Sequence, residues 1–458
     1  MSSEKGPSEN GSSNSSSPHS RTNVARSKLQ HAFHRKPHSM NVWSVAALGI
    51  GSMVGAGVFA LLGQIAFNVG GNAWIIFIIA GIAALFSGYA YSRMSAQFPS
   101  RGGVIDFFMI GVPFSKLARS LSTLYLITLI LTIAMVCKAF GAYSARFINE
   151  SGQPFWIDVF ASLSLVGLLL VNLLGAKVVG RVETTLVGIK LIILAIFIVA
   201  GVMTLDIGKL ENHPPLRANA IFSSVGLAFF AYAGFGMMAN ASEDIDKPSV
   251  SMPRAFMLAI GSVMALYIIL SLVVLGNVTP RELLLYADTA VAQAAKPVLG
   301  NFGFTLVLMA ALFATASATM ANLFSALNVS NSMGESHVLP KIFSPKTPTS
   351  STIGFYILMI FVLLLINLFD LSVIANIASA GFLACYLGVF FACWNKRHEC
   401  DANPTALIIG FVLMLIIFTT FIAELVLTKQ WDQCLILLVA FIVSAGFGWR
   451  EPTSDIPK

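Results

Sequence analysis

The chain has 458 residues, of which 56% are hydrophobic and 11% are charged, and its formal net charge at pH 7 is +7. An ordinary soluble domain carries about 25% charged residues, because its exterior must be covered by polar groups. The composition therefore excludes a cytosolic enzyme, a nucleic-acid-binding protein and a disordered scaffold. It indicates an all-α integral membrane protein embedded in the lipid bilayer.

The chain begins with a polar segment, residues 1–40, which is rich in Ser, Asn, His and Gly and holds six of the 28 Lys and Arg residues. Such a composition cannot bury enough apolar surface to fold, so we expect a disordered tail. The five cysteines form no CxxC pair and no zinc-ligand pattern is present. We therefore predict no metal and no cofactor.

From residue 42 onward, long apolar runs alternate with short polar gaps. A spanning helix needs about 20 apolar residues, so twelve helices would use about 240 residues and leave loops of ordinary length. We predict twelve membrane spans, at residues 42–68, 72–94, 117–147, 155–176, 183–205, 218–242, 253–277, 300–333, 349–369, 372–394, 405–427 and 431–449.

The positions of the Lys and Arg residues predict the orientation, because cytoplasmic segments carry the excess of positive charge. With the N-terminus inside, 20 Lys and Arg residues fall in cytoplasmic segments, six fall outside and two fall within spans. We therefore expect both termini in the cytoplasm of a cell that holds this chain in its plasma or inner membrane. We expect a helical core at 41–396, two further helices at 397–450 and a cytoplasmic end at 451–458.

The first span contains four glycines within nine residues, Gly49 to Gly57. Glycine costs a helix about 1 kcal/mol relative to alanine, although glycines in membrane helices also serve close packing. The sixth span, residues 218–242, again has small residues near its middle, within the segment 229–236. Corresponding interruptions in two five-helix halves are typical of inverted-repeat transporters, whose substrate site lies at the repeat interface. We predict that both helices are broken at such a site.

Five segments, in this order along the chain, resemble the amino acid–polyamine–organocation superfamily, and specifically its broad-specificity, proton-coupled amino acid permeases of archaeal type. They are GSMVGAGVF in the first span, FPSRGG at 98–103, NLLGAKVVGRVE with GIKL in the fifth span, FFAYAGFG with ASEDIDKPSVSMPRA at 229–255, and AAKPVLGNFGF at 294–304. The resemblance covers nearly all of residues 41–394. It implies a LeuT-like core of ten helices in two inverted repeats of five, with two more helices at the C-terminus.

Broken helices can bind the groups that all amino acids share. The start of the second half-helix presents free N–H groups and a positive dipole end to a carboxylate, and unwound carbonyls can accept from an ammonium. Tyr232 and Phe235 flank the second break and either cover the substrate or pack within the protein. We expect the substrate-binding residues to be Met53, Val54, Gly55, Ala56, Gly57, Phe230, Ala231, Tyr232, Ala233 and Phe235.

Lys190 lies about seven residues into the fifth span, or about 10 Å from its cytoplasmic end. A charge at this depth is costly and usually functional, although a lysine can also extend to the membrane surface. In the permeases that this chain resembles, a lysine here contacts the backbone of the first span and a hydroxyl on the eighth. The resemblance therefore assigns proton coupling to Lys190, with Gly51 and either Thr315 or Ser317 as its contacts.

Lys138 lies about 30 Å along the third span, near the outer interface. We expect its side chain to extend to the membrane surface, the alternative being a role in an outer vestibule. No Asp or Glu falls in the central part of a span. Because a polyamine needs buried carboxylates, the sequence favours a zwitterionic amino acid.

We therefore predict a secondary active amino acid transporter, a proton-coupled symporter that works by alternating access. The alternatives are an amino acid exchanger or exporter without obligate proton coupling, a membrane-embedded enzyme, and a sensor that kept the fold without transport. No pattern of clustered catalytic residues supports the enzyme. The sequence carries no signal for the oligomeric state.

Overall fold

The structure is a computed structural model that describes residues 40–100, 102–148, 153–173, 176–211, 218–344 and 353–449. The predicted tail and C-terminal end therefore lie outside the described residues, apart from Met40. Within these ranges the regular elements are helices. In chain order they are α2 (Val42–Met53), α3 (Ala56–Val69), η1 (Gly70–Asn72), α4 (Ala73–Gln97), α5 (Val104–Gly111), α6 (Ser115–Ala145), α7 (Pro154–Leu173), α8 (Ala176–Met203), α9 (Ile207–Glu211), α10 (Ala218–Tyr232), η2 (Ala233–Ala241), α11 (Pro248–Asn277), α12 (Pro280–Tyr286), η3 (Ala287–Thr289), α13 (Ala290–Glu335), η4 (Lys341–Phe343), α14 (Ile353–Leu368), α15 (Leu371–Asn395), α16 (Pro404–Leu427) and α17 (Trp431–Trp449).

Ten stretches of the described chain are long and apolar enough to cross a membrane, and α2 and α14 are shorter apolar helices. These two short helices fall on the predicted first and ninth spans. Many large apolar side chains on α14, α16 and α17 are exposed, as expected for helices that face lipid rather than water. The all-helical, multi-pass class of membrane protein is thereby confirmed.

The predicted break in the first span is present. Helix α2 ends at Met53 and α3 begins at Ala56, so Val54 and Gly55 lie between two half-helices. The Gly55 N–H turns back to donate to the Met53 carbonyl, with an N···O distance of 2.7 Å. Gly55 is the N-cap of α3 and provides no side-chain hydrogen bond to it.

The sixth span changes character at the predicted place, but its backbone tightens rather than unwinds. Helix α10 ends at Tyr232, and the chain continues directly as the 3₁₀ helix η2. A 3₁₀ segment inside a longer helix often marks a functional hinge, because its hydrogen bonds are poorer than those of an α-helix. A parallel bridge between Met40 and Ile245 then joins the start of α2 to the turn that follows η2.

The predicted eighth span, residues 300–333, is the second part of α13, a helix that begins at Ala290. It contains a kink at Gly300, whose φ of 67° lies in the left-handed region that favours glycine. Pro297, three residues before the kink, lacks the N–H that a continuous helix would use.

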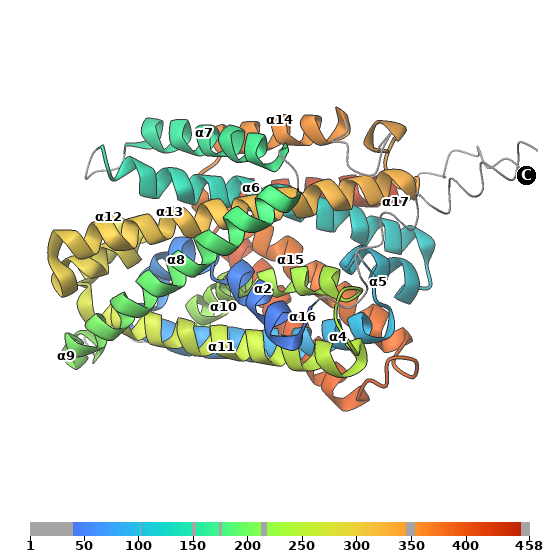
Figure 1. Ribbon diagram of the computed structural model, residues 1–458, viewed down its shortest axis with the longest axis horizontal. Helices are drawn as coiled ribbons and strands as arrows, with labels where there is room; N and C mark the ends of the chain where they lie inside the picture. The colour runs from blue at the N-terminus through green and yellow to red at the C-terminus, as the bar shows by residue number, and fades with distance from the viewer. Residues whose placement is uncertain are drawn as a thin grey trace, which may run out of the picture.

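The broken helices lie inside the bundle. Helix α2 packs on α11 and η2, and α3 packs on α10 and α13. In Figure 1 the labels of α2 and α10 lie near the middle of the molecule, with α11 along one edge and α7 and α14 along the opposite edge. The interrupted backbone is therefore surrounded by protein, which is a requirement for non-helical backbone at membrane depth.

Candidate functional site

The break between α2 and α3 lies against the junction of α10 and η2, and glycines allow the contact between these two interruptions, called the two breaks below. A Cβ atom added to Gly57 would come within 2.5 Å of the Ala231 Cα. One added to Gly234 would come within 2.8 Å of the Ser52 carbonyl carbon and 2.9 Å of the Met53 nitrogen. The glycines of the first span therefore serve both purposes considered above, since they accompany the break and they bring the backbones of α3 and α10 together.

Tyrosine hydroxyls hold the carbonyls at these breaks. The Tyr267 hydroxyl on α11 lies 2.6 Å from the Met53 carbonyl oxygen and 3.0 Å from that of Ala231. Both oxygens are within hydrogen-bond distance, so they share this one donor. The Tyr386 hydroxyl on α15 donates to the Ala233 carbonyl at 2.8 Å. Each carbonyl oxygen has a second lone pair, so an ammonium can still be accepted there. The sequence analysis did not identify either tyrosine.

A small cavity of about 50 Å³ lies where the breaks meet. It includes five of the residues expected to bind substrate, Met53, Gly57, Phe230, Ala231 and Ala233. Its other lining residues come from the end of α2, from η2, and from α6, α13 and α15. They are Ser52, Tyr125, Leu129, Thr132, Val136, Gly234, Met237, Ala318, Asn322 and Phe382.

The remaining expected residues lie beside the cavity rather than on its described lining. Val54, Gly55 and Ala56 form the turn into α3, whose N-terminal N–H groups are the expected anion site. Tyr232 is buried and donates to the Phe77 carbonyl at 2.9 Å. Phe235 packs edge-on against Tyr91, with 5.3 Å between ring centroids. The structure thus places these two aromatic side chains among neighbouring helices.

Lys190 is fully buried on α8, and its Nζ donates to the Gly51 carbonyl at 2.8 Å. No Asp or Glu oxygen among the described residues lies within 4.0 Å of this ammonium. The Thr315 hydroxyl instead donates to Ala311 and Leu312 of its own helix. Ser317 is also buried. The structure therefore brings Lys190 to Gly51, just before the break, but brings neither hydroxyl within hydrogen-bond distance of Nζ.

A second, larger cavity of about 740 Å³ lies farther along the bundle. Going along α10, Leu227 lines the large cavity and Phe230 lines the small one. On α15 the same order holds for Asn376 and Phe382. The Phe230 and Phe382 rings pack edge to face with centroids 5.6 Å apart. This aromatic pair therefore stands on the side of the small cavity that faces the large one.

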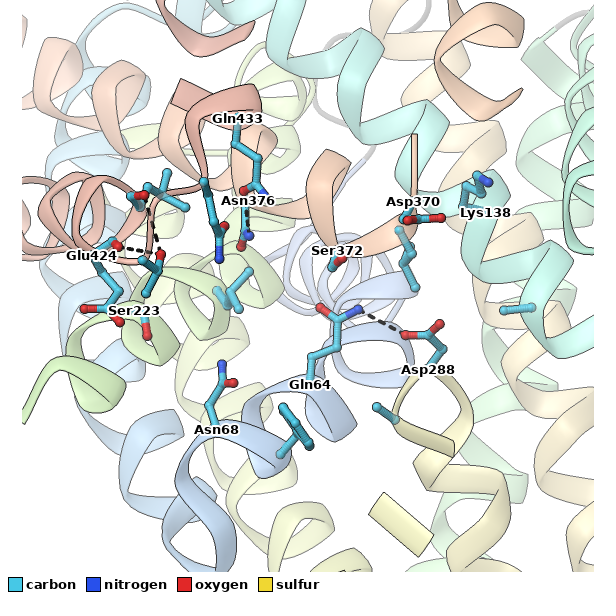
Figure 2. Close-up of a pocket in the computed structure, with 18 of the residues that line it drawn as sticks. Gln64, Asn68, Lys138, Ser223, Asp288, Asp370, Ser372, Asn376, Glu424 and Gln433 are labelled. Atoms are coloured by element: carbon cyan, nitrogen blue, oxygen red, sulfur yellow. Dashed lines mark hydrogen bonds between the residues drawn. The ribbon is translucent and has the colours of Figure 1, made fainter. Parts of the chain in front are cut away.

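Carboxylates dominate the charge of the large cavity, as Figure 2 shows for three of the four on its lining. Gln64 Nε2 donates to the Asp288 carboxylate at 3.1 Å. Asp370 lies just before α15 and Glu424 lies on α16. The fourth acid, Asp158, forms an ion pair with Lys138. With one lysine against four acids, the lining favours cations and zwitterions over anions.

The placement of Lys138 corrects the sequence-based expectation. Its side chain is 7% exposed and its Nζ is bonded to Asp158 of α7 on the lining of the large cavity. The Lys138 side chain therefore does not extend to the membrane surface. Its position on the lining of the large cavity matches the alternative, a place in a vestibule. Depth along a helix was known from the sequence, but the face that Lys138 occupies was not.

We predict that Asp158→Asn destabilises the protein, because it leaves the buried Lys138 ammonium without its ion partner. The loss should be about 3 kcal/mol or less, since Asp158 itself is partly exposed to the cavity. Thermal unfolding in detergent measures it. The double variant Lys138→Met with Asp158→Asn should recover most of the loss, and an unchanged melting temperature for the single variant would contradict the role of the pair.

An all-helical membrane bundle with two interrupted helices, meeting at a small internal cavity, defines a membrane transport protein. The family model for amino acid permeases matches residues 40–447, nearly all of the described chain. The chain therefore belongs to the amino acid permease family, which confirms the resemblance at the level of the family.

Individual relatives agree with this family. The chain is 44% identical to the inner membrane transport protein YbaT of Escherichia coli, over 88% of this chain and 94% of that protein. It is 32% identical to an uncharacterized protein of Methanocaldococcus jannaschii, over 86% and 90% of the two chains. It is 24% identical to a methylthioribose transporter of Bacillus subtilis, over 79% and 82%. The protein is thus a multi-pass amino acid transporter of the plasma membrane.

Proposed function

We propose that this protein is a proton-coupled amino acid symporter that works by alternating access. The observation that carries the proposal is the hydrogen bond from the buried Lys190 ammonium to the Gly51 carbonyl, two residues before α2 ends. A charged donor on a carbonyl contributes more than a neutral one, so protonation of Lys190 favours the arrangement in which α2 and α8 are joined. Loss of the proton weakens this preference, because a neutral amine is a poorer donor.

Substrate binding in this proposal uses the two breaks. The carboxylate meets the N–H groups at the start of α3, around Gly55 to Gly57, where the helix dipole favours an anion. The ammonium meets the carbonyls of Met53, Phe230, Ala231 and Ala233, of which three already accept from tyrosine hydroxyls. Both contacts use main-chain groups, so they suit every amino acid and leave side-chain selection to the cavity walls.

The orientation follows from the distribution of positive charge. With the N-terminus in the cytoplasm, the large cavity faces outward, because it is lined at the ends of α3 and α16 and at the starts of α7 and α10. Phe230 and Phe382 then separate the external cavity from the substrate site. A substrate that enters from outside must move this pair, and inward release must loosen η2 from α2.

The number of spans belongs to the same proposal. We assign twelve, with α2 and α3 together as the first, α10 and η2 as the sixth, and α16 and α17 as the last two. The first ten then form two inverted repeats of five, each opening with an interrupted helix. The close approach of the Gly57 and Ala231 backbones brings the two interruptions together, which supports this division.

Purified protein in liposomes tests the function. When the outside is acidic, the concentration of labelled amino acid inside the liposomes should rise above the concentration outside. A proton ionophore should abolish this accumulation. Uptake that needs amino acid preloaded inside, and ignores the pH gradient, would instead establish the exchanger. Because one relative is a methylthioribose transporter, the competition panel should include that sugar beside all amino acids.

A further inference from the structure

Tyr125 differs from the other buried tyrosines of the described chain. Six tyrosines are less than 9% exposed, and five of them have hydrogen-bond partners. These five are Tyr143, Tyr232, Tyr267 and Tyr386, which donate to carbonyl oxygens, and Tyr91, which pairs with the Tyr386 hydroxyl. The Tyr125 side chain, on α6, is 7% exposed as a residue, yet its hydroxyl has no partner among the described residues.

The location of Tyr125 explains the free hydroxyl. Its ring packs edge-on against Phe382, with centroids 6.2 Å apart, and it lines the small cavity at the helix breaks. The Tyr125 hydroxyl is not among the fully buried polar atoms that lack a partner, so it is open to the cavity rather than enclosed by protein. Because the free donor faces the cavity of a transporter, the missing partner is best supplied by the transported molecule.

A second polar group with free capacity lines the same cavity. Asn322 on α13 donates from Nδ2 to the Ala318 carbonyl at 2.8 Å, and its Oδ1 has no partner among the described residues. Thr132 also lines the cavity, but its hydroxyl already donates to the Thr128 carbonyl at 2.7 Å. The cavity thus offers a hydroxyl that donates or accepts and an amide oxygen that accepts.

The cavity also limits the ligand by size and charge. It has a volume of about 50 Å³, so a short side chain demands the least rearrangement of the walls. None of its described lining residues is Asp, Glu, Lys, Arg or His, so a charged side chain would lose its hydration without compensation.

We propose that Tyr125 is a specificity-determining residue, whose hydroxyl hydrogen-bonds the side chain of a short, neutral, hydroxyl-bearing amino acid, of which L-serine is the simplest. This inference rests on the proposed function, because it concerns the same substrate site. Serine both donates to Asn322 Oδ1 and accepts from Tyr125. Alanine fits the space but leaves both groups without a partner.

The test compares the serine-to-alanine ratio of kcat/KM in liposomes for the wild type, Tyr125→Phe and Thr132→Val. We expect the wild type to prefer serine, and Tyr125→Phe to lower the ratio by about three- to tenfold, the size expected for one neutral hydrogen bond. Serine uptake by Tyr125→Phe should fall more than alanine uptake does. Thr132→Val is the matched control, because its hydroxyl is used within α6, and it should keep the ratio.

An unchanged ratio in Tyr125→Phe, or an equal loss of serine and alanine uptake, would overturn the inference. If Tyr125→Phe yields too little protein, Asn322→Ala gives the same comparison from the other side of the cavity. Thermal stabilisation of detergent-purified wild type by serine over alanine separates the two proposals. Selective stabilisation without any transport would reject the transport function alone, and transport that prefers alanine would reject the specificity alone.

Discussion

Lys190→Met is expected to abolish the response of amino acid uptake to an imposed proton gradient. Methionine nearly matches lysine in length and can fill the buried site on α8, but it cannot donate to the Gly51 carbonyl or carry a proton. A hydrogen bond from a charged donor contributes about 1.5–3 kcal/mol, which corresponds to a shift of roughly 10- to 150-fold between two conformations. Without it, gradient-driven accumulation should fall at least about tenfold, while binding of substrate survives.

Lys190→Arg sharpens the same experiment, because arginine keeps its charge at every physiological pH. The permanent charge should keep α2 and α8 joined throughout. This variant should therefore also lose concentrative uptake, because it cannot leave the charged arrangement, whereas Lys190→Met cannot enter it. Lys209→Met is the matched control: Lys209 also donates to a backbone carbonyl, that of Asn277 at 3.2 Å, but from the short helix α9. A full proton response in Lys190→Met, or its loss in Lys209→Met, would contradict the assignment of coupling to Lys190.

The interrupted helices could be predicted from the sequence because their signal is local. Repeated glycines within an apolar run weaken a helix wherever it packs, so the gap between Met53 and Ala56 could be expected without a structure. The 3₁₀ geometry of η2 could not, since it depends on how Ser52 and Met53 pack over Gly234. Lys190 stood out because charge at membrane depth is rare.

The direction in which a side chain points from its helix could not be predicted from the sequence. Lys138 and Tyr125 are both on α6, and their depth follows from the helical rise, but the partner or cavity that each meets depends on the neighbouring helices. Asp158 on α7 turned Lys138 inward to an ion pair. Tyr267 was missed for the same reason, because nothing in a lone tyrosine on α11 indicates that its hydroxyl reaches Met53 and Ala231.

Gly57→Ala is expected to reduce amino acid uptake by about tenfold or more. The added methyl carbon would lie 2.5 Å from the Ala231 Cα and 3.1 Å from its carbonyl oxygen, and backbone atoms cannot turn aside as a flexible side chain can. Overpacking of this kind costs about 1–3 kcal/mol. The added methyl group fits only if α3 and α10 move apart. That separation moves the N–H groups of α3 away from the carbonyls of α10. Both the substrate affinity and the transport rate should therefore fall.

Gly261→Ala is the matched control for this experiment, because it makes the same change on α11 at a position where an added Cβ meets nothing within 4 Å. It should leave transport unchanged and slightly stabilise the protein, since alanine favours a helix over glycine by up to about 1 kcal/mol. Uptake and substrate-induced thermal stabilisation are measured for both variants. If Gly57→Ala transports and binds as the wild type does, the contact between the two breaks is not needed for the substrate site. The substrate must then bind elsewhere in the bundle.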